Sequence, residues 1–365
     1  MTSTGKPRVF GAGLIALDLV ISSDPQTPVR SWAGGTCGNV LSILAYLGWD
    51  AFPIARLNGD PASIRVRADM EHWGVRLDHA CCAPTAHTPI IIQEIRRGRD
   101  GRPSHRFSWS CPRCGEWLPG FKAVTIEAAD AVLPALEGAS VFFLDRLSRA
   151  TLNLAERASA EGAIVIFEPS GKGADKLFTE ALRLAHIVKY SDQRLAEADT
   201  ALESSSASIV EIQTLGERGL RYRHRLRRTW SDWLHLGAIA APRLKDACGA
   251  GDWCTAGLIA TIAARGQEGL SKLGAKELRE GLRYGQALAA WSCGFEGARG
   301  GMYAVSREGF EEQVADLLSG RLKSLPEALV EAVPGVTINC PACPPPSRHR
   351  HTRRASRTRR RKAAA

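Results

Sequence analysis

The sequence predicts a mixed α/β fold, in which a parallel sheet covered by helices on both faces forms a three-layer core and carries a small β-sheet lid. From about residue 124 onward, short apolar runs alternate with helical segments, a pattern typical of parallel strands that are buried on both faces. The first third of the chain instead contains closely spaced strands around polar, turn-rich connections, which indicates hairpins. The 365 residues are enough for one large domain of this kind.

The N-terminal third is predicted to begin with two strands and a helix. Val9 to Ser22 contains two apolar runs around a glycine-containing turn, and we expect a strand on each side of that turn. Residues 39–47 are predicted to form a short helix, because their apolar side chains fall on one helical face and Gly48 is a suitable C-terminal stop.

A second pair of strands is expected further along this third of the chain. Residues 89–96 and 104–110 are apolar or alternating, and a polar turn-rich segment joins them. We therefore expect the lid to comprise about residues 12–38 and 85–118.

The remainder of the chain supplies the parallel sheet of the core. Its apolar runs are short, as expected for strands buried between two helical layers. The predicted strands are 141–144, 164–167, 187–189 and 209–214, and the predicted helices between them include 150–161 and 176–185.

The segment from Lys245 to Gly257 is the most informative for function. Its small residues precede an apolar helix, and Gly249 and Gly251 allow the backbone to aim several N–H groups outward. A helix N-terminus adds a partial positive charge, so the segment is suited to bind a phosphate. Asp252 lies at the mouth of this anion pocket, where a carboxylate can accept a proton from an attacking hydroxyl. A capped helix start without this chemistry is the alternative interpretation, and the P-loop pattern is absent.

Several motifs resemble the ribokinase-like family of sugar kinases, also called PfkB, and they occur in the family's order over roughly residues 8–320. Asp246-Ala-Cys-Gly-Ala-Gly-Asp252 is similar to the C-terminal signature Asp-Thr-x-Gly-Ala-Gly-Asp. The other matching segments are Asp18, Gly34-Gly-Thr-Cys-Gly-Asn39, Asn58-Gly-Asp60 and Thr214-Leu-Gly-Glu-Arg-Gly219.

The resemblance implies a Rossmann-type core and a kinase that uses ATP with Mg²⁺ to phosphorylate a hydroxyl of a sugar, nucleoside or related polyol. Homodimers formed through the lid are common in this family, so a homodimer is the candidate assembly, although the sequence leaves the oligomeric state open. By this resemblance, Asp252 is the general base, and Gly249, Ala250 and Gly251 form the anion hole. The substrate-binding residues would be Asp18, Gly34, Gly35 and Asn39, and the nucleotide-binding residues would be Asp246, Thr214, Gly216 and Gly219.

Two departures from the family pattern motivate a second hypothesis. Ala247 replaces the threonine of the C-terminal signature, and Arg194 replaces the glutamate of the Asn-x-x-Glu motif, which appears here as Ser191-Asp-Gln-Arg194. The alternative is a catalytically silent binding or regulatory protein with the same fold. Taken singly, Asp18 is also a candidate turn cap, and Asn39 is a candidate helix N-cap.

Two Cys-x-x-Cys pairs indicate a structural zinc site. Cys111 with Cys114, and Cys340 with Cys343, each have the spacing that lets two sulfurs reach one tetrahedral ion. A shared zinc ion is the leading interpretation, and two independent or empty pairs are the alternative. We accordingly expect a kinase domain over 1–335 and a cysteine segment over 336–346.

The net charge of +10 is concentrated at the C-terminus. Residues 347–365 contain nine Lys and Arg and no acidic residue, so subtracting nine from ten leaves about +1 for residues 1–346. We expect this basic tail to be disordered. No aromatic residue interleaves its arginines, so we do not expect nucleic-acid binding to be its function. The N-terminus has no signal pattern and no apolar run has the length of a membrane span, which predicts a cytoplasmic protein.

Overall fold

The computed structural model describes most of the chain. The described residues are 5–57, 59–82, 86–99, 101–171, 175–195, 207–322 and 324–325. Cys340, Cys343 and the basic tail lie outside them. None of the described helices is both long and apolar enough to cross a membrane.

A nine-stranded sheet forms the centre of the structure, in the spatial order β13-β12-β11-β10-β9-β8-β1-β4-β5. All neighbouring pairs from β11 to β5 are parallel, whereas β12 and β13 pair antiparallel at one edge. The strands are β1 (Arg8–Ala12), β4 (Asp50–Leu57), β5 (Ala80–Cys82), β8 (Val141–Leu144), β9 (Ile164–Phe167), β10 (Ile187–Ser191), β11 (Val210–Thr214), β12 (Leu220–His224) and β13 (Leu234–Leu236). The predicted parallel α/β core is therefore confirmed.

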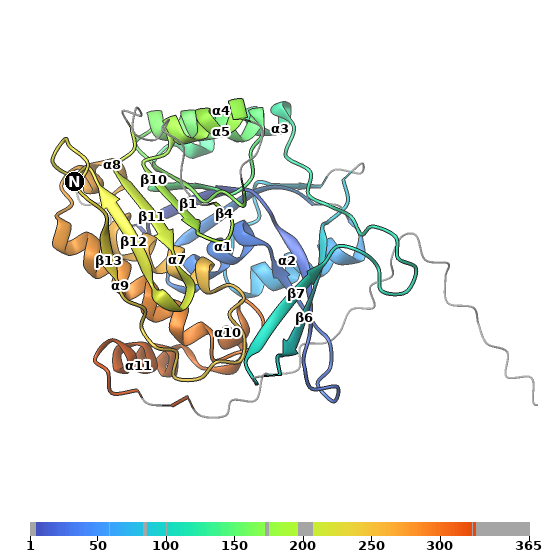
Figure 1. Ribbon diagram of the computed structural model, residues 1–365. Helices are drawn as coiled ribbons and strands as arrows, with labels where there is room; N and C mark the ends of the chain where they lie inside the picture. Colours follow the sequence, from blue (N-terminus) through green and yellow to red (C-terminus); the bar gives the residue numbers. More distant parts are fainter. Residues whose placement is uncertain are drawn as a thin grey trace, which may run out of the picture.

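Helices cover both faces of this sheet, and the alternation of side chains along each strand explains why. In β8, for example, Phe142 and Leu144 belong to one apolar core, whereas Val141 and Phe143 belong to the other. The first core is covered by α3 (Ile126–Asp130), η1 (Leu133–Leu136), α4 (Arg149–Ala160) and α5 (Asp175–Leu184), seen above the sheet in Figure 1. The second is covered mainly by α1 (Thr36–Tyr46), α2 (Pro61–His72), α7 (Ala250–Ile262), α8 (Gly266–Ser271), α9 (Ala275–Ser292), α10 (Gly300–Ala304) and α11 (Arg307–Leu318).

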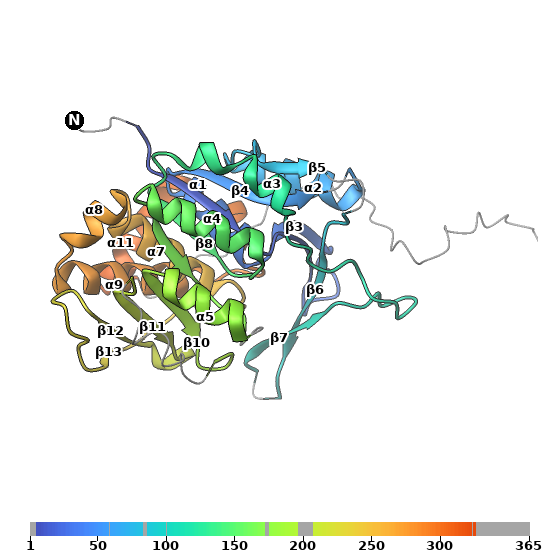
Figure 2. The same cartoon turned by 90° about the horizontal axis from the view of Figure 1, so that it is seen from above.

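A second sheet of four strands, the small sheet, projects from this body (Figure 2). Its strands run in the order β3-β2-β6-β7 and are β2 (Ala16–Ile21), β3 (Arg30–Gly34), β6 (Ile90–Arg97) and β7 (Pro103–Ser108). This is the second sheet that the sequence predicted, although β7 ends two residues earlier than expected.

The small sheet is fastened to the segment that precedes α10. Glu296 accepts hydrogen bonds from Ser22 (2.8 Å) and from Arg30 (2.9 Å). Trp32 of β3 is buried and stacks on Tyr303 of α10, with ring centroids 4.6 Å apart. The small sheet is thus anchored to the body by these contacts.

Candidate active site

The start of α7 has the backbone geometry that the glycine-rich segment predicted. Gly249 adopts a left-handed conformation (φ 74°), and a β-carbon at this position would come within 2.5 Å of the side chain of Ala298. Only glycine fits both conditions. The first i to i−4 hydrogen bond of α7 runs from Trp253 N–H to Gly249 C=O. The N–H groups of Gly251 and Asp252 therefore precede the first hydrogen bond of this kind in the helix.

Asp252 lies in the first turn of α7 and is only 9% exposed. Its Oδ2 accepts a hydrogen bond of 2.7 Å from the side-chain amide of Asn39. Burial raises the pKa of Asp252 to about 8, and the nearby carboxylate of Glu168 adds to this rise. The Asn39 hydrogen bond and the positive charge of Lys189 act in the opposite direction. The carboxyl group is therefore a stronger proton acceptor than an exposed aspartate.

The residues predicted to bind substrate lie around the N-terminus of α1. Asp18 is in the middle of β2, and its carboxylate packs against Gly34, where a β-carbon would be 1.9 Å from Oδ2. Gly35, the N-cap of α1, has φ 76°, and its N–H donates a hydrogen bond to Asp18. Burial raises the pKa of Asp18 to about 7, although Arg299 lowers it.

The capping roles considered for Asn39 and Asp18 are wrong. Asn39 is an internal residue of α1, which begins at Thr36 rather than at residue 39, and Gly35 is the N-cap. Its buried side chain reaches Asp252 instead of a backbone N–H group. Asp18 is a strand residue and caps no turn.

A buried ion pair between Lys189 and Glu168 lies next to the first turn of α7. Lys189 of β10 donates to Glu168, which follows β9, over 2.8 Å, and the Lys189 side chain is 2% exposed. Thr255 of α7 donates to the second oxygen of the Glu168 carboxylate (2.6 Å). A β-carbon on Gly251 would lie 3.7 Å from the Lys189 ammonium, so the pair borders the predicted anion pocket. The sequence interpretation did not include either charged residue.

Asp246 connects the glycine-rich segment to the small sheet. One carboxylate oxygen accepts hydrogen bonds from Gln93 of β6 (2.6 Å) and from Gly297 N–H (2.9 Å). The other accepts from Cys248 N–H (3.0 Å) and lies 3.3 Å from the imidazole of His105 in β7. Asp246, which was predicted to contact the nucleotide, is thus held by side chains of the small sheet.

Thr214, Gly216 and Gly219, which were predicted to bind the nucleotide, lie in or next to the turn between β11 and β12. Thr214 ends β11, and Leu215 N–H donates to Gly219 C=O (2.8 Å), which closes the turn around Gly216. The carboxyl ends of parallel strands share one sheet edge, so this turn and Asp252 are on the same side of the core. Among the described residues, no hydrogen bond joins this turn to Asp252.

The segment that replaces the family's Asn-x-x-Glu motif offers no free carboxylate. Arg194 stands where the glutamate would be, and its positive charge lowers the pKa of Asp252. Asp192, the remaining acidic residue, forms an ion pair of 2.8 Å with Arg218. Within the described ranges, no group of three or more His, Cys, Asp or Glu side chains is arranged to hold a metal ion.

Asp145, which follows β8, is a further polar residue that the sequence interpretation missed. Its carboxylate accepts from Leu14 N–H (2.9 Å) and from Arg146 (2.8 Å). Burial raises its pKa to about 6. Its position in the sequence could have indicated a site residue, because the carboxylate comes directly after a predicted apolar strand, and ligands bind at the carboxyl ends of parallel strands.

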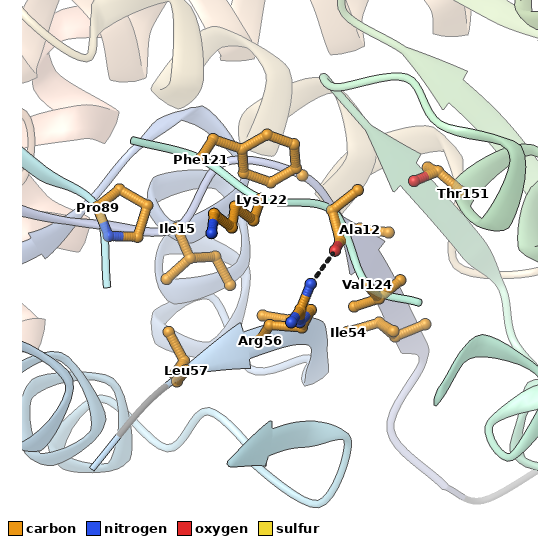
Figure 3. A pocket seen from close by; sticks show the side chains of 13 residues that line it. Ala12, Ile15, Ile54, Arg56, Leu57, Pro89, Phe121, Lys122, Val124 and Thr151 are labelled. Carbon is orange, nitrogen blue, oxygen red and sulfur yellow. Dashed lines mark hydrogen bonds between the residues drawn. The ribbon is translucent and has the colours of Figure 1, made fainter. Parts of the chain in front are cut away.

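A small pocket opens beside Gly13, at the carboxyl ends of β1 and β4 (Figure 3). Apolar side chains such as Ile15 and Val124 line it together with Arg56 and Lys122. It contains none of the residues that the sequence predicted to be catalytic or ligand-binding. The buried polar groups around Asp252 define the candidate site.

The cysteine pair at 111–114 forms a tight turn. Gly115 N–H donates to Cys111 C=O (2.8 Å), Cys111 N–H donates to Glu116 C=O (2.8 Å), and Gly115 has φ 78°. Cys111 is buried and Cys114 is exposed. Their predicted partners, Cys340 and Cys343, are outside the described part of the chain.

A buried carboxylate at a helix N-terminus, on the carboxyl edge of a three-layer parallel core with a second small sheet, is the arrangement that the resemblance to small-molecule kinases predicted. The chain belongs to the pfkB family of carbohydrate kinases, whose family model matches residues 13–303. A search of curated proteins found no match to the chain.

The chain is similar in fold to solved structures of small-molecule kinases. Fructokinase with bound ATP from Xylella fastidiosa is 20% identical (TM-score 0.63; 87% of this chain and 99% of that chain). Arabidopsis thaliana ribokinase complexed with ribose and ATP is 19% identical (TM-score 0.60; 86% and 99%). Burkholderia thailandensis nucleoside kinase in complex with inosine is 17% identical (TM-score 0.60; 87% and 99%). At these identities the likeness shows the fold alone.

Proposed function

We propose that this protein transfers the γ-phosphoryl group of ATP to a hydroxyl of a sugar, nucleoside or related polyol, with Asp252 as the general base. One observation carries the proposal: Asp252 is buried in the first turn of α7, beside N–H groups that precede the helical ladder, and Asn39 holds one of its oxygens. The proton acceptor and the predicted anion pocket are therefore adjacent.

The proposed reaction is an in-line displacement. The substrate hydroxyl gives its proton to Oδ1 of Asp252, because Asn39 occupies Oδ2. The hydroxyl oxygen bonds to the γ-phosphorus while the bond from that phosphorus to the bridging oxygen breaks, and ADP leaves. The backbone N–H groups of Gly251 and Asp252 and the α7 dipole stabilise the charge on the transferring group.

Asp18 and Asn39 are proposed to face the substrate. Oδ1 of Asp18 is buried and has no hydrogen-bond partner among the described residues. An unpaired buried carboxylate oxygen is costly, so a ligand hydroxyl that donates to it would bind favourably. Gly34 and Gly35 would contact the substrate through their backbone, since a side chain at either position would clash.

On the nucleotide side, we propose that Thr214, Gly216 and Gly219 contact ATP and that Asp246 lies near its phosphates. Mg²⁺ is proposed to arrive with ATP, whose phosphates neutralise their charge by binding it. The motif at 191–194 does not fit a metal ligand set, because Arg194 is cationic and Asp192 is paired with Arg218. No step of the proposed reaction is therefore assigned to the ion.

The test is ADP formation from ATP in the presence of D-ribose, D-fructose, inosine and a wider set of polyols. We expect ADP release that depends on one added hydroxyl compound, with the matching phosphate ester detected by mass spectrometry. ATP binding without any such dependence across the set would contradict the proposal and favour the catalytically silent alternative.

We further propose that Cys111, Cys114, Cys340 and Cys343 share one structural zinc ion. The tight turn at 111–115 supports this, because two residues between sulfurs and a glycine after the second cysteine suit one tetrahedral ion. Protein purified without chelator is expected to contain about one zinc per chain.

The design of the zinc measurement separates a shared site from independent ones. A Cys111→Ser/Cys114→Ser variant and a Cys340→Ser/Cys343→Ser variant should each lose the ion completely, whereas Cys293→Ser should retain it. Elemental analysis that finds no zinc in the unmodified protein would rule the site out. The homodimer that the family resemblance suggests stays a prediction.

A further inference from the structure

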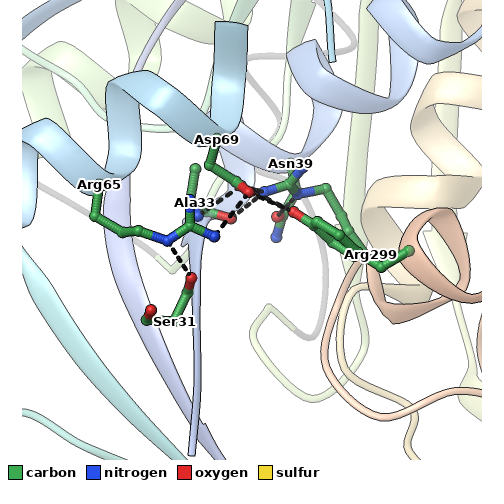
Figure 4. Close-up of polar contacts among 7 residues, drawn as sticks. Ser31, Ala33, Asn39, Arg65, Asp69 and Arg299 are labelled. Carbon is green, nitrogen blue, oxygen red and sulfur yellow. Dashed lines mark hydrogen bonds and ion pairs between the residues drawn. The ribbon is translucent and has the colours of Figure 1, made fainter. Parts of the chain in front are cut away.

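Arg299, immediately before α10, is a buried arginine that joins three parts of the fold (Figure 4). Its side chain is 1% exposed. One terminal nitrogen donates to the carbonyl of Ala33 in β3 and to Asp69 of α2 (2.6 Å). Its Nε donates to Oδ1 of Asn39 in α1 over 3.2 Å. No sequence motif had indicated a role for this residue.

The Asn39 amide lies between Arg299 and Asp252, with its two ends engaged differently. Its NH₂ group donates to Oδ2 of Asp252, and its oxygen accepts from Arg299. An amide side chain has one donor end and one acceptor end, whereas a guanidinium has donors alone. The donors of Arg299 and the acceptor oxygen of Asp252 therefore favour the same orientation of the Asn39 amide, and Arg299 favours it also when Asp252 is protonated.

We propose that Arg299 is a positioning residue for phosphoryl transfer: by holding the oxygen of Asn39, it keeps the Asn39 NH₂ group on Oδ2 of Asp252 and leaves Oδ1 for the substrate hydroxyl. This inference rests on the proposed function for its catalytic consequence. The orientation of the amide itself is independent of which substrate is used.

The Arg299 guanidinium is held in place by the Asp69 carboxylate, which several other donors also fix. Asp69 accepts hydrogen bonds from Arg299, from Ala33 N–H (2.9 Å) and from the hydroxyl of Tyr303 (2.8 Å), and it forms an ion pair with Arg65 (3.3 Å). Fixed geometry of this kind is what a positioning residue requires. The remaining terminal nitrogen of Arg299 is buried and has no partner among the described residues.

The charged groups around Asp252 cannot replace this arrangement. Glu168 raises the pKa of Asp252, and Lys189 and Arg194 lower it, but none of them hydrogen-bonds either of its oxygens among the described contacts. The buried thiols beside Asp252 have pKa values raised by burial, so they stay neutral. The groups that face Asp252 are Cys37, Asn39, Glu168, Lys189, Arg194 and Cys248.

Removing Arg299 should let the Asn39 amide turn its oxygen toward Asp252. The protonated carboxyl group of Asp252 would then donate to that oxygen, whereas its ionised form would lose a charge-assisted hydrogen bond, so protonation is favoured. In Arg299→Met, we expect the pKa of Asp252 to rise by about one unit, which corresponds to a tenfold change in proton affinity. Carboxyl-¹³C NMR titration measures this directly, with Asp252→Asn used to assign the signal.

Kinetics give a second readout of the same shift. We expect the acidic limb of the kcat/KM pH profile to shift to higher pH by about one unit. The substrate for this measurement is the polyol that the wild-type enzyme phosphorylates. Activity lost near neutral pH should recover in part at higher pH, which a merely unfolded fraction would not show. Arg299→Lys, which keeps the charge beside Asp69, is expected to shift in the same direction and to fold if the methionine variant does not.

Two controls make the result specific. Tyr303→Phe removes a neighbouring contact to Asp69 without touching Asn39, so it should lower stability and leave the Asp252 titration unchanged. In an Asn39→Ala background, Arg299→Met should add no further shift. An unshifted titration in both Arg299 variants, or an equal shift in Tyr303→Phe, would overturn the inference. Absence of phosphoryl transfer in the wild type would overturn the proposed function and leave the amide orientation intact.

Discussion

Asp252→Asn is expected to lower the rate of phosphoryl transfer by about 10²–10⁴-fold, the range that general-base catalysis supplies. The asparagine keeps the size of the side chain but cannot accept the proton of the substrate hydroxyl. Binding of ATP and of the polyol should persist, because the neighbouring N–H groups and Asp18 are unchanged. Steady-state kinetics and ligand titration together check this, and Asp78→Asn at the exposed surface is the matched control. Turnover close to the wild-type value would remove Asp252 from the mechanism.

The same variant should change how stability depends on pH. The pKa of Asp252 is raised from 3.8 to about 8, so the folded state binds more protons than the unfolded state between these values. Stability contributed by this group is therefore present at low pH and is lost as pH rises through that window. We expect Asp252→Asn to have a higher Tm than the wild type at pH 8 and a smaller difference at pH 5. Equal differences at both values, measured by thermal unfolding, would contradict the raised pKa.

Lys189→Met is expected to cost about 3–5 kcal/mol in the free energy of unfolding, the range for breaking a buried ion pair by removing one partner. The Lys189 and Glu168 side chains are 2% and 10% exposed, so the substitution would leave a carboxylate without its cation in a dry environment. Urea denaturation at neutral pH measures the loss.

A double variant distinguishes the lost pair from lost packing. Lys189→Met combined with Glu168→Gln removes both charges, and most of the stability should return. Lys272→Met, which breaks an exposed pair with Glu268 in α8, should leave the unfolding curve unchanged. If the double variant were as unstable as the single one, the cost would lie in packing and not in the unpaired charge.

The parallel core was predictable from the sequence because its strands are apolar on both faces. The runs at 141–144 and 164–167 coincide with β8 and β9. β4 was not predicted, and Pro53 within it explains why: proline removes a ladder donor and argues against an interior strand. It lies opposite Gly11 in the register with β1.

The candidate site was only partly predictable, for a different reason. Asp252 and Asn39 occur in recognisable local patterns, and the structure joins them by a hydrogen bond. Arg299 is 260 positions from Asn39 along the chain, and nothing in its local sequence distinguishes it from a surface arginine. Contacts of this kind depend on the topology of the fold, which a single sequence does not give.

The contacts of Gln93 and His105 with Asp246 have a kinetic consequence. Asp252 is 9% exposed, and both contacts join the small sheet to the glycine-rich segment that leads into Asp252. Movement of the small sheet away from this segment would have to break these two polar contacts to one carboxylate. We expect that, if turnover requires this movement of the sheet, a solvent of higher viscosity will slow it.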